Sequence, residues 1–296
     1  MKTLEKNIIN LSGQAGKNWL DKLPNILHYL SQMWGVTDIK PVSNMTWNYV
    51  AKAIKDKDIP VVIKISCQND TSKAEAQALT YLKGSIIELI DYNSECNALL
   101  LKQAVPGISL RSLYPQQAEQ AMLYYTNVVN NLCSNGNQIS PPIFPSINKW
   151  LISLDKIDAS KLPDELLHTA VTLKNNLLNQ PKKQYVLHGD LHMDNVISDK
   201  DGWIAIDPKG IIGEREFEVA CFDFIHKSEF NKTNIPNLFE TRAIFLANQL
   251  GLELARLKQW VFIRLILGAC WMIEDNGSPQ LFLEQANKIF PNKHNI

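Results

Sequence analysis

The strongest constraint on the fold is the polar run His188–Asn195, which reads HGDLHMDN and is followed by Asp207 twelve residues later. Two short apolar runs, 196–198 and 203–206, lie between Asn195 and Asp207 and flank the turn signal DKDG. This spacing predicts a β-hairpin that brings Asp207 back beside Asn195. One amide and two carboxylates would then meet at one place.

Such a set of side chains suits phosphoryl transfer from a nucleotide. In that reaction the protein orients the acceptor hydroxyl and holds the metal ions that neutralise charge on the phosphates. We assign Asp190 as the catalytic base. Mg²⁺ prefers hard oxygen ligands from a few side chains and completes its shell with phosphates and water. We therefore predict Mg²⁺ as cofactor, Asn195 and Asp207 as its ligands, and ATP or GTP as co-substrate.

The same run has a second interpretation as a zinc site. His188, Asp190, His192 and Asp194 alternate, so on a strand they would line one face and resemble a zinc ligand set that activates water. Gly189 favours a loop over a strand, and the other histidines are isolated in the sequence. We favour phosphoryl transfer over zinc hydrolysis, and both over a polar surface loop without chemistry.

Upstream, a strand and a helix supply the charged pair that would bind the nucleotide phosphates. Residues 60–65 are rich in β-branched side chains and carry one charge, Lys64. A helix is expected to begin near Ser72, with Glu75 on its apolar stripe. Because a buried carboxylate needs a partner, we predict an ion pair between Lys64 and Glu75.

Both members of this pair also have a structural interpretation. A lysine on an edge strand limits aggregation, which is the commoner role of such a residue. Ser72 and Glu75 match the S-x-x-E capping box, in which the Glu side chain satisfies a free N–H at the helix start. The position of Lys64 just before an acidic helix favours the ion pair, and the cap stays open as a role for Glu75.

Two connecting segments are predicted to contact the nucleotide. Strands are expected over 41–54 and 59–65, joined by the charged turn 55–58. In the earlier part of this region, a loop at residues 43–48 would offer backbone N–H groups and the hydroxyls of Ser43 and Thr46, without glycines for close approach.

The second connecting segment follows the short apolar strand 98–102 and contains the turn dipeptide Pro106-Gly107. We interpret 103–107 as a hinge. Backbone groups from Gln103 to Val105 would hydrogen-bond the purine edge.

The chain resembles the aminoglycoside phosphotransferase superfamily, and within it the streptomycin 6-kinase group of aminoglycoside or hydroxyurea antibiotic resistance kinases. The spacing D-x-x-x-x-N, hairpin, D is similar to the catalytic loop and metal-binding Asp of protein kinases. A more specific likeness is WIAIDPKG at 203–210 followed by GEREF at 213–217. The resemblance supports the roles of Asp190, Asn195 and Asp207, and implies that Lys64 and Glu75 position the triphosphate.

The resemblance also implies the fold, an α+β, bilobal protein-kinase-like architecture with a small antiparallel-sheet lobe and a larger, mostly helical lobe. We expect the N-terminal nucleotide-binding lobe, with its leading helices, over 1–102 and the hinge over 103–107. The C-terminal catalytic and substrate-binding lobe would cover 108–296.

For the acceptor, the resemblance implies a pocket built by the C-terminal helices. Four carboxylates are predicted to receive the guanidinium or amine groups of a streptomycin-like substrate: Glu214, Glu218, Glu274 and Asp275. Glu218 stands where relatives usually carry an Asp that supports the catalytic loop, so that role is also open. A solvated acidic helix start is the structural alternative for Glu214 and Glu218.

Composition narrows the partner class. The chain has 30 Lys and Arg against 30 Asp and Glu, and this balance is not the excess of positive charge that is typical of nucleic-acid-binding proteins.

Two further patterns concern the location of the protein. The N-terminus leads into no apolar signal core, and the late apolar stretch 260–273 is too short for a membrane span. Five scattered cysteines indicate reduced thiols. We expect a soluble, cytoplasmic monomer or weak dimer that binds a small molecule.

The resemblance, taken with the site residues, implies three candidate functions. The leading one is transfer of the γ-phosphate to a hydroxyl of an aminoglycoside. A housekeeping kinase for another small alcohol, such as choline, homoserine or a sugar-like compound, is the alternative, since a fold does not fix a function. A nucleotide-binding pseudokinase is the third, and the complete set of Lys64, Asp190, Asn195 and Asp207 argues against it.

Overall fold

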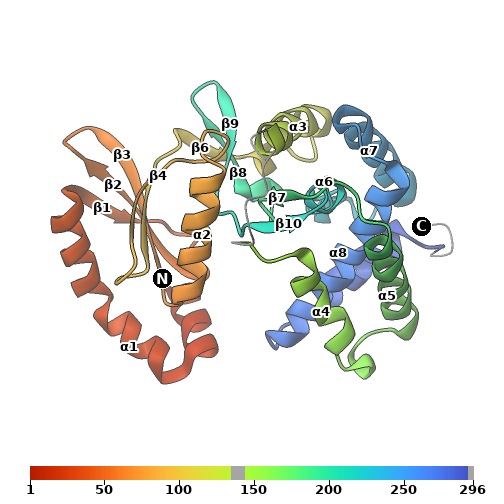
Figure 1. Ribbon diagram of the computed structural model, residues 1–296, viewed down its shortest axis with the longest axis horizontal. Helices are drawn as coiled ribbons and strands as arrows, with labels where there is room; N and C mark the ends of the chain where they lie inside the picture. The colour runs from red at the N-terminus through yellow and green to blue at the C-terminus, as the bar shows by residue number, and fades with distance from the viewer. Residues whose placement is uncertain (135–143, 293–296) are drawn as a thin grey trace. The chain divides into compact units, whose positions relative to one another are not determined.

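The computed structural model describes residues 1–134 and 144–292. The chain forms two compact units, Met1–Gly107 with Ser198–Lys209, and Ile108–Ile197 with Gly210–Ile296. The first contains an antiparallel sheet and the second is mostly helical (Figure 1), which confirms the predicted α+β class. We expected residues 108–296 to form one contiguous lobe, and for Ser198–Lys209 this is wrong. That segment attaches to the first unit, where the Ile87 N–H donates to the Ala205 carbonyl over 3.0 Å.

The first unit is built on a five-stranded sheet with the strand order β1-β2-β3-β5-β4, in which neighbours run antiparallel. At its centre, β3 pairs with β2 and β5, and Lys64 lies opposite Val50 on one side and Leu99 on the other. Lys64 is therefore not on an edge strand. The strands are β1 (Val36–Pro41), β2 (Asn48–Lys55), β3 (Ile59–Ser66), β4 (Leu89–Asn93) and β5 (Ala98–Lys102).

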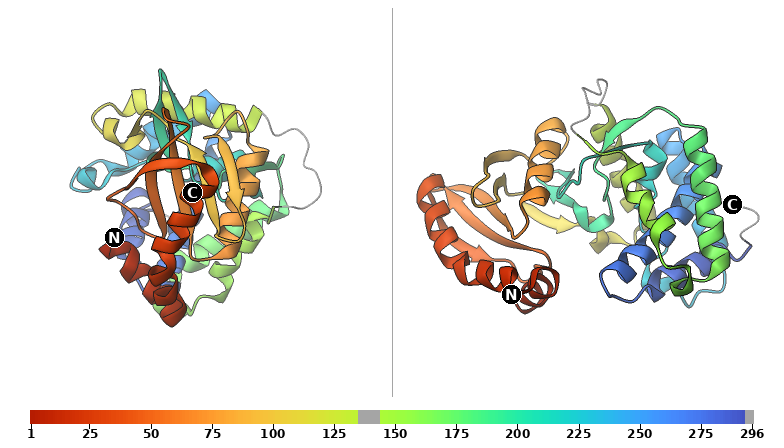
Figure 2. Two further views of the ribbon diagram at one scale, coloured as in Figure 1. Left: turned by 90° about the vertical axis from the view of Figure 1, so that its left-hand side faces the viewer. Right: turned by 60° about the horizontal axis from the view of Figure 1, so that its bottom comes forward.

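Helices flank both faces of this sheet. Alternate residues of β3, including Ile63 and Ile65, are fully buried in a core shared with Leu30 and Trp34 of α1 (Lys2–Trp34). Because successive side chains of a strand point to opposite faces, Lys64 points away from α1 and towards α2 (Asn69–Tyr81). Figure 2 shows the two helices on either side of the strands.

The predicted hairpin is present as β8 (Val196–Asp199) and β9 (Gly202–Ala205). Together with β6 (Pro106–Ser109) these strands form a three-stranded sheet in the order β6-β8-β9. The chain passes from one unit to the other within β6 and β8. Asp207, at the end of the hairpin, thus belongs to the first unit.

The second unit is organised around α8 (Leu254–Glu274), which contacts the helices α4, α5, α6, α7 and α9. Its side chains are buried on nearly all sides, as expected for a helix that is apolar all round. A two-stranded sheet pairs β7 with β10. The elements are α3 (Ala118–Ser134), α4 (Ile147–Lys156), α5 (Asp164–Asn179), β7 (Tyr185–Leu187), β10 (Ile211–Gly213), α6 (Arg215–Val219), α7 (Ile235–Leu250) and α9 (Gln280–Ile289).

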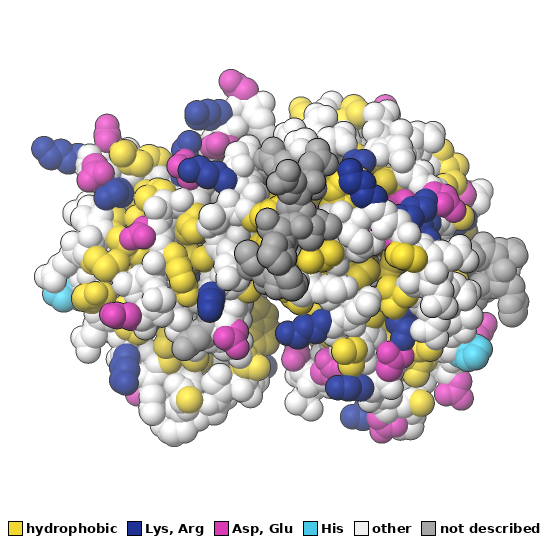
Figure 3. All heavy atoms as spheres, viewed as in Figure 1, with side chains coloured by type: hydrophobic (Ala, Val, Ile, Leu, Met, Phe, Trp, Pro, Cys, Tyr) yellow, Lys and Arg dark blue, Asp and Glu magenta, His cyan; other side chains and the backbone are white. Residues whose placement is uncertain are grey.

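Four short 3₁₀ turns complete the described elements: η1 (Leu110–Leu113), η2 (Ala159–Lys161), η3 (Met193–Asn195) and η4 (Lys227–Glu229). Within the described ranges, none of the helices combines the length and apolar character needed to cross a membrane. On the face drawn in Figure 3, basic and acidic side chains are interspersed, in keeping with the zero formal net charge.

Candidate active site

Three charged side chains of the first unit meet at Lys64. Its Nζ lies 2.7 Å from Oε2 and 2.8 Å from Oε1 of Glu75, and 2.5 Å from Oδ1 of Asp207. Lys209 reaches the other oxygen of Asp207 over 3.1 Å. The predicted ion pair of Lys64 with Glu75 is thus present, and Asp207 joins it.

The capping-box interpretation of Glu75 is wrong. Helix α2 begins at Asn69, three residues earlier than predicted, and its N-cap Gln68 makes no side-chain cap. Ser72 is consequently a buried residue inside the helix. Glu75 lies beyond the first turn, where no backbone N–H is free, and its carboxylate contacts Lys64 instead.

These contacts keep Lys64 and Asp207 charged, whereas burial raises the pKa of Glu75 above its usual value against the opposing effect of Lys64. Burial alone would lower the pKa of Lys64, but the carboxylates of Asp207 and Glu75 raise it above its usual value. Burial would raise the pKa of Asp207, and the ammonium groups of Lys64 and Lys209 hold it well below its usual range instead. Asp207 is an ionised carboxylate with one third of its side chain exposed, which suits a ligand for a divalent cation.

The turn between β1 and β2 carries the residues predicted to cradle the phosphates. Ser43 and Thr46 are both exposed there. Two contacts hold this turn in place. The side chain of Met45 is buried, and the Thr46 carbonyl accepts a hydrogen bond from the Asn7 side chain over 3.0 Å. Its two hydroxyls remain candidates for a phosphate contact.

The hinge prediction needs a correction. The Gln103 N–H donates to the Pro60 carbonyl over 3.1 Å. Val105 donates to Oδ1 of Asp199 over 3.1 Å, and its carbonyl accepts from the Lys200 N–H over 2.7 Å. These groups are therefore not free for a purine. Among the hydrogen bonds recorded for the described residues, none involves the Ala104 N–H, the Gln103 carbonyl or the Ala104 carbonyl.

In the second unit, the loop that carries Asp190 is fixed by its own side chains. The Asp190 N–H donates to Nδ1 of the fully buried His188 over 3.2 Å, and the Asp190 carbonyl accepts from Nδ2 of Asn195 over 2.9 Å. Gly189 has a φ of 87°, a conformation that favours glycine. Because Asn195 donates through Nδ2, its oxygen Oδ1 stays available as a metal ligand. Asn195 and Asp207 thus each present an oxygen of the kind Mg²⁺ prefers.

Neighbouring elements hold the same loop from outside. The hydroxyl of Tyr125 on α3 donates to the Leu191 carbonyl over 2.9 Å, a contact that sequence reasoning missed. Glu218 on α6 accepts from the Gly189 N–H through Oε2 over 2.9 Å. Its side chain is buried, and burial raises the pKa of Glu218 to about 7. This geometry favours support of the loop over contact with a substrate.

Asp190 lines a cavity of about 350 Å³ within the second unit. Two further carboxylates and two guanidinium groups line it, together with apolar side chains of α8 and α9. The volume is that of a small-molecule site. The charged lining residues are Arg111, Asp190, Asp194, Asp223 and Arg264, and the apolar ones include Val261, Leu265, Trp271, Phe282 and Ile289.

The four carboxylates predicted to bind the substrate do not line this cavity. Glu214 is buried, and its oxygens accept from Arg256 over 2.6 and 2.7 Å and from Trp260 over 3.1 Å. Glu218 contacts the loop as described. Glu274 and Asp275 lie exposed at the C-terminal end of α8. We assign Glu214 a structural role, since its charge is already neutralised by Arg256.

Arg264 approaches Asp190 from α8. Its guanidinium carbon lies 4.9 Å from the ring centroid of Phe217, 5.5 Å from that of Trp271 and 5.7 Å from that of Trp150. Its Nη2 is 3.9 Å from Oδ1 of Asp190. Three aromatic rings thus hold a cation beside the predicted base. The signal in the sequence was a single arginine inside an apolar helix.

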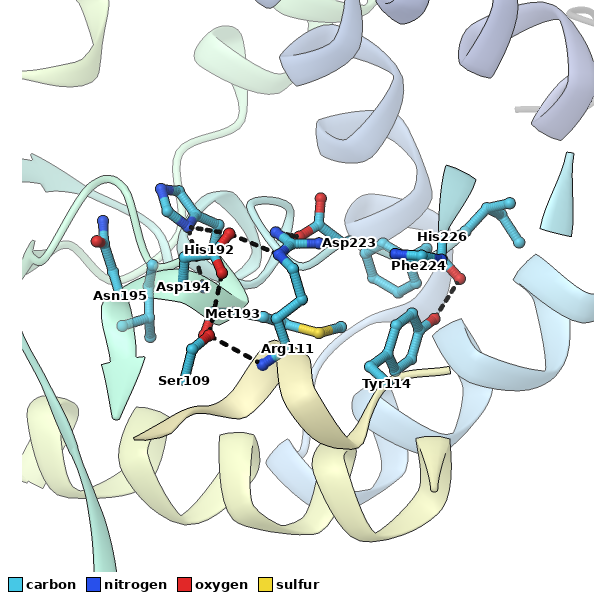
Figure 4. A network of polar contacts seen from close by, with 12 residues as sticks. Ser109, Arg111, Tyr114, His192, Met193, Asp194, Asn195, Asp223, Phe224 and His226 are labelled. Atoms are coloured by element: carbon cyan, nitrogen blue, oxygen red, sulfur yellow. Dashed lines mark hydrogen bonds and ion pairs between the residues drawn. The ribbon is translucent and has the colours of Figure 1, made fainter. Parts of the chain in front are cut away.

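Arg111, in η1, bridges two carboxylates of the cavity (Figure 4). Its Nε lies 2.5 Å from Oδ2 of Asp194, and its Nη2 lies 2.5 Å from Oδ2 of Asp223. Ser109 adds a hydrogen bond to Oδ1 of Asp194 over 3.0 Å. Burial lowers the pKa of Arg111, but the two carboxylates raise it more, so the guanidinium stays charged.

The zinc alternative has no support in this geometry. Over residues 1–134 and 144–292, no three His, Cys, Asp or Glu side chains are grouped so as to hold a metal ion. The Nδ1 atoms of His188 and His192 instead accept hydrogen bonds from the backbone of their own loop. The run His188–Asn195 is a loop followed by a 3₁₀ turn rather than a strand.

Comparison with known proteins decides the family. The profile of the aminoglycoside/hydroxyurea antibiotic resistance kinases matches residues 34–276. The chain belongs to this family. It is accordingly a phosphotransferase, as predicted. It is 28% identical over 227 residues to streptomycin 3''-kinase of Klebsiella pneumoniae, covering 75% of this chain and 83% of that protein. It is 22% identical over 275 residues to streptomycin 6-kinase of Streptomyces glaucescens, covering 90% and 88%.

Solved structures confirm the protein-kinase-like fold. An aminoglycoside phosphotransferase in a ternary complex with ADP and hygromycin B superposes with a TM-score of 0.63 at 13% identity, covering 90% of this chain and 97% of that chain. Choline kinase from Streptococcus pneumoniae gives a TM-score of 0.65 at 13% identity, covering 92% and 99%. At this identity the likeness shows the fold alone.

Proposed function

We propose that this kinase transfers the γ-phosphate of ATP to a hydroxyl of a small, streptomycin-like molecule. The observation that carries the proposal is the setting of Asp190. Its carboxylate lines a cavity of about 350 Å³ and makes no hydrogen bond to the described residues, so it is free to accept one from an acceptor hydroxyl. The relatives named as streptomycin kinases support the acceptor class.

The proposal assigns a role to each of the site residues described above. Asp190 accepts the proton of the attacking hydroxyl, and His188, Tyr125 and Glu218 hold its loop in place. Lys64, fixed by Glu75, binds the nucleotide phosphates. Asn195 and Asp207 would hold Mg²⁺, which neutralises charge on the phosphates when bound.

The nucleotide is proposed to contact the first unit. The ADP complex of the related fold supports an adenine nucleotide. In the connecting segment, the Ala104 N–H and the Gln103 carbonyl are the proposed contacts for the base, in place of Val105. Ser43 and Thr46 are the proposed phosphate contacts in the β1–β2 turn.

A panel of acceptors tests the proposal. Purified protein with ATP and Mg²⁺ is assayed against streptomycin, hydroxyurea, choline and an uncharged polyol, with nucleotide consumption and the mass of the phosphorylated product as readouts. We expect acceptor-dependent transfer to streptomycin or hydroxyurea that disappears in Asp190→Asn. Transfer to choline alone would favour the housekeeping kinase, and nucleotide binding without transfer to any acceptor would favour the pseudokinase.

A further inference from the structure

We propose that Arg111 limits the positive charge of the acceptor. By occupying Asp194 and Asp223, its guanidinium leaves the cavity able to receive one cationic group beside the reacting hydroxyl rather than several. This inference rests on the proposed function, because it assigns the acceptor class for the same cavity. It predicts that the cavity receives one cationic group of a streptomycin-like acceptor, and that any further cationic group of that acceptor lies outside the cavity.

The first step concerns Asp194. Both of its carboxylate oxygens already have a partner within the second unit, since Oδ2 accepts from Nε of Arg111 and Oδ1 accepts from the Ser109 hydroxyl. The Arg111 backbone N–H in turn donates to Ser109 Oγ over 3.2 Å. Asp194 is therefore tied into the wall of the cavity (Figure 4) and cannot receive a substrate cation without losing a partner.

Asp223 differs from Asp194 in one respect. Arg111 occupies Oδ2, whereas Oδ1 makes no hydrogen bond to the described residues. About a third of this side chain is exposed, and it lines the same cavity as Asp190. Asp223 Oδ1 is thus the one oxygen of the Arg111-bridged pair that is left to receive a cationic group of the acceptor.

The charges that line the cavity also indicate that it can receive only one cationic group of the acceptor. Three aspartates and two arginines line it, which leaves an excess of one negative charge on these groups. The rest of the lining includes Val261, Leu265, Phe282 and Ile289, which offer no counter-ion. A second cation on the acceptor would lose its water against these apolar groups and Arg111 without a compensating partner.

Removal of the guanidinium tests this inference directly. Arg111→Met keeps an aliphatic stem of similar length and exposes both carboxylates. Binding of methylguanidine is measured by calorimetry at fixed ionic strength. We expect Arg111→Met to bind the probe at least ~10-fold more tightly than the wild type, and Arg111→Met combined with Asp194→Asn and Asp223→Asn to lose the gain. Equal binding to the wild type and Arg111→Met would overturn the proposal. Arg111→Gln repeats the comparison if the methionine variant does not fold.

Selectivity between acceptors provides the second readout. In Arg111→Met, the ratio of kcat/KM for streptomycin to kcat/KM for an uncharged polyol should rise ~10-fold or more over the wild type. A purely structural Arg111 would lower both values equally and leave the ratio unchanged, which would overturn the inference.

The matched control is Arg215→Met. Arg215 is half-buried and donates to Asn130 over 2.8 Å, and it does not line the cavity, so the ratio should stay at its wild-type value. Failure of the proposed function and failure of this inference about Arg111 give different results. A wild type that phosphorylates no acceptor would refute the function, while methylguanidine binding would still report on Arg111.

Discussion

Asp190 and Asp207 are both aspartates, and their surroundings differ in a way that separates their roles. Among the described residues, Asp190 has no ion-pair distance shorter than 3.9 Å, which is its distance both to Nη2 of Arg264 and to Nε2 of His192. Asp207 is held between Lys64 and Lys209. The first carboxylate is free to take a proton from an acceptor, and the second is kept ionised.

Asp190→Asn preserves the shape of the side chain and cannot accept the hydroxyl proton. We expect kcat to fall ~10²-fold or more while nucleotide affinity changes little. Steady-state kinetics and nucleotide titration of the same preparation measure both. An equal loss of nucleotide binding would show that Asp190 is not the base.

Asp207→Ala removes a proposed metal ligand and one of the two carboxylates at Lys64. We expect nearly complete loss of phosphoryl transfer with the fold retained, because Glu75 still neutralises the ammonium group. Turnover at saturating Mg²⁺ is compared with the wild type after circular dichroism has verified folding. Activity close to that of the wild type would exclude Asp207 from the metal site.

At the scale of elements, the hairpin, the strand of Lys64 and β5 followed from local pattern, whereas β1 did not. The hairpin has a clear turn signal between apolar runs. β1 has exposed or half-exposed residues after Val36, so it shows no apolar alternation to recognise. The S-x-x-E pattern predicts a helix start near Ser72, whereas α2 begins three residues earlier, at Asn69.

The residues that line the acceptor cavity could not be predicted from local sequence patterns, for a different reason. Arg111 and Asp223 are 112 residues apart, and no periodicity links them. Two of the four carboxylates chosen from the sequence, Glu214 and Glu218, lie in or beside the GEREF motif. Of these, Glu214 proved to connect elements rather than to line a cavity.

Glu214 joins α8 to the end of α5. Arg256 on α8 binds its carboxylate and also donates to the carbonyls of Leu177 and Gln180 over 3.0 and 2.9 Å. We expect Glu214→Gln to lower the free energy of unfolding by ~3 kcal/mol, because the buried Arg256 would lose the one carboxylate that it hydrogen-bonds directly and keep only the longer-range attraction of Glu216 and Glu253. Urea unfolding measures the change. A loss below ~1 kcal/mol would show that the ion pair contributes little.

At the scale of the whole molecule, acid stability should depend on Glu229. Arg242 donates to both of its oxygens over 2.7 and 2.9 Å. Burial alone would raise the pKa of Glu229, but Arg242 and Lys232 lower it to about 2. A depressed folded-state pKa gives stability that is present above the ordinary value of 4.5 and is lost as the pH falls towards 2.

Glu229→Gln tests this linkage. We expect the variant to be less stable than the wild type at pH 6, and the difference in unfolding free energy to shrink as the pH falls from about 5 to about 2. Denaturant unfolding at several pH values gives both curves. A difference that stays constant with pH would show that Glu229 does not titrate with folding.

The first unit draws on two separate stretches of the chain, since Ser198–Lys209 joins Met1–Gly107. A ribosome therefore releases most of this unit long before it releases Asp207. During that interval Lys64 has Glu75 as its acidic partner, and β9 is not yet there to bond to Ile87. The second stretch of the first unit is made only after residues 108–197 have been added to the chain. A fragment that ends at residue 107 would lack Ser198–Lys209, and with it Asp207 and the β8–β9 hairpin segment of the first unit.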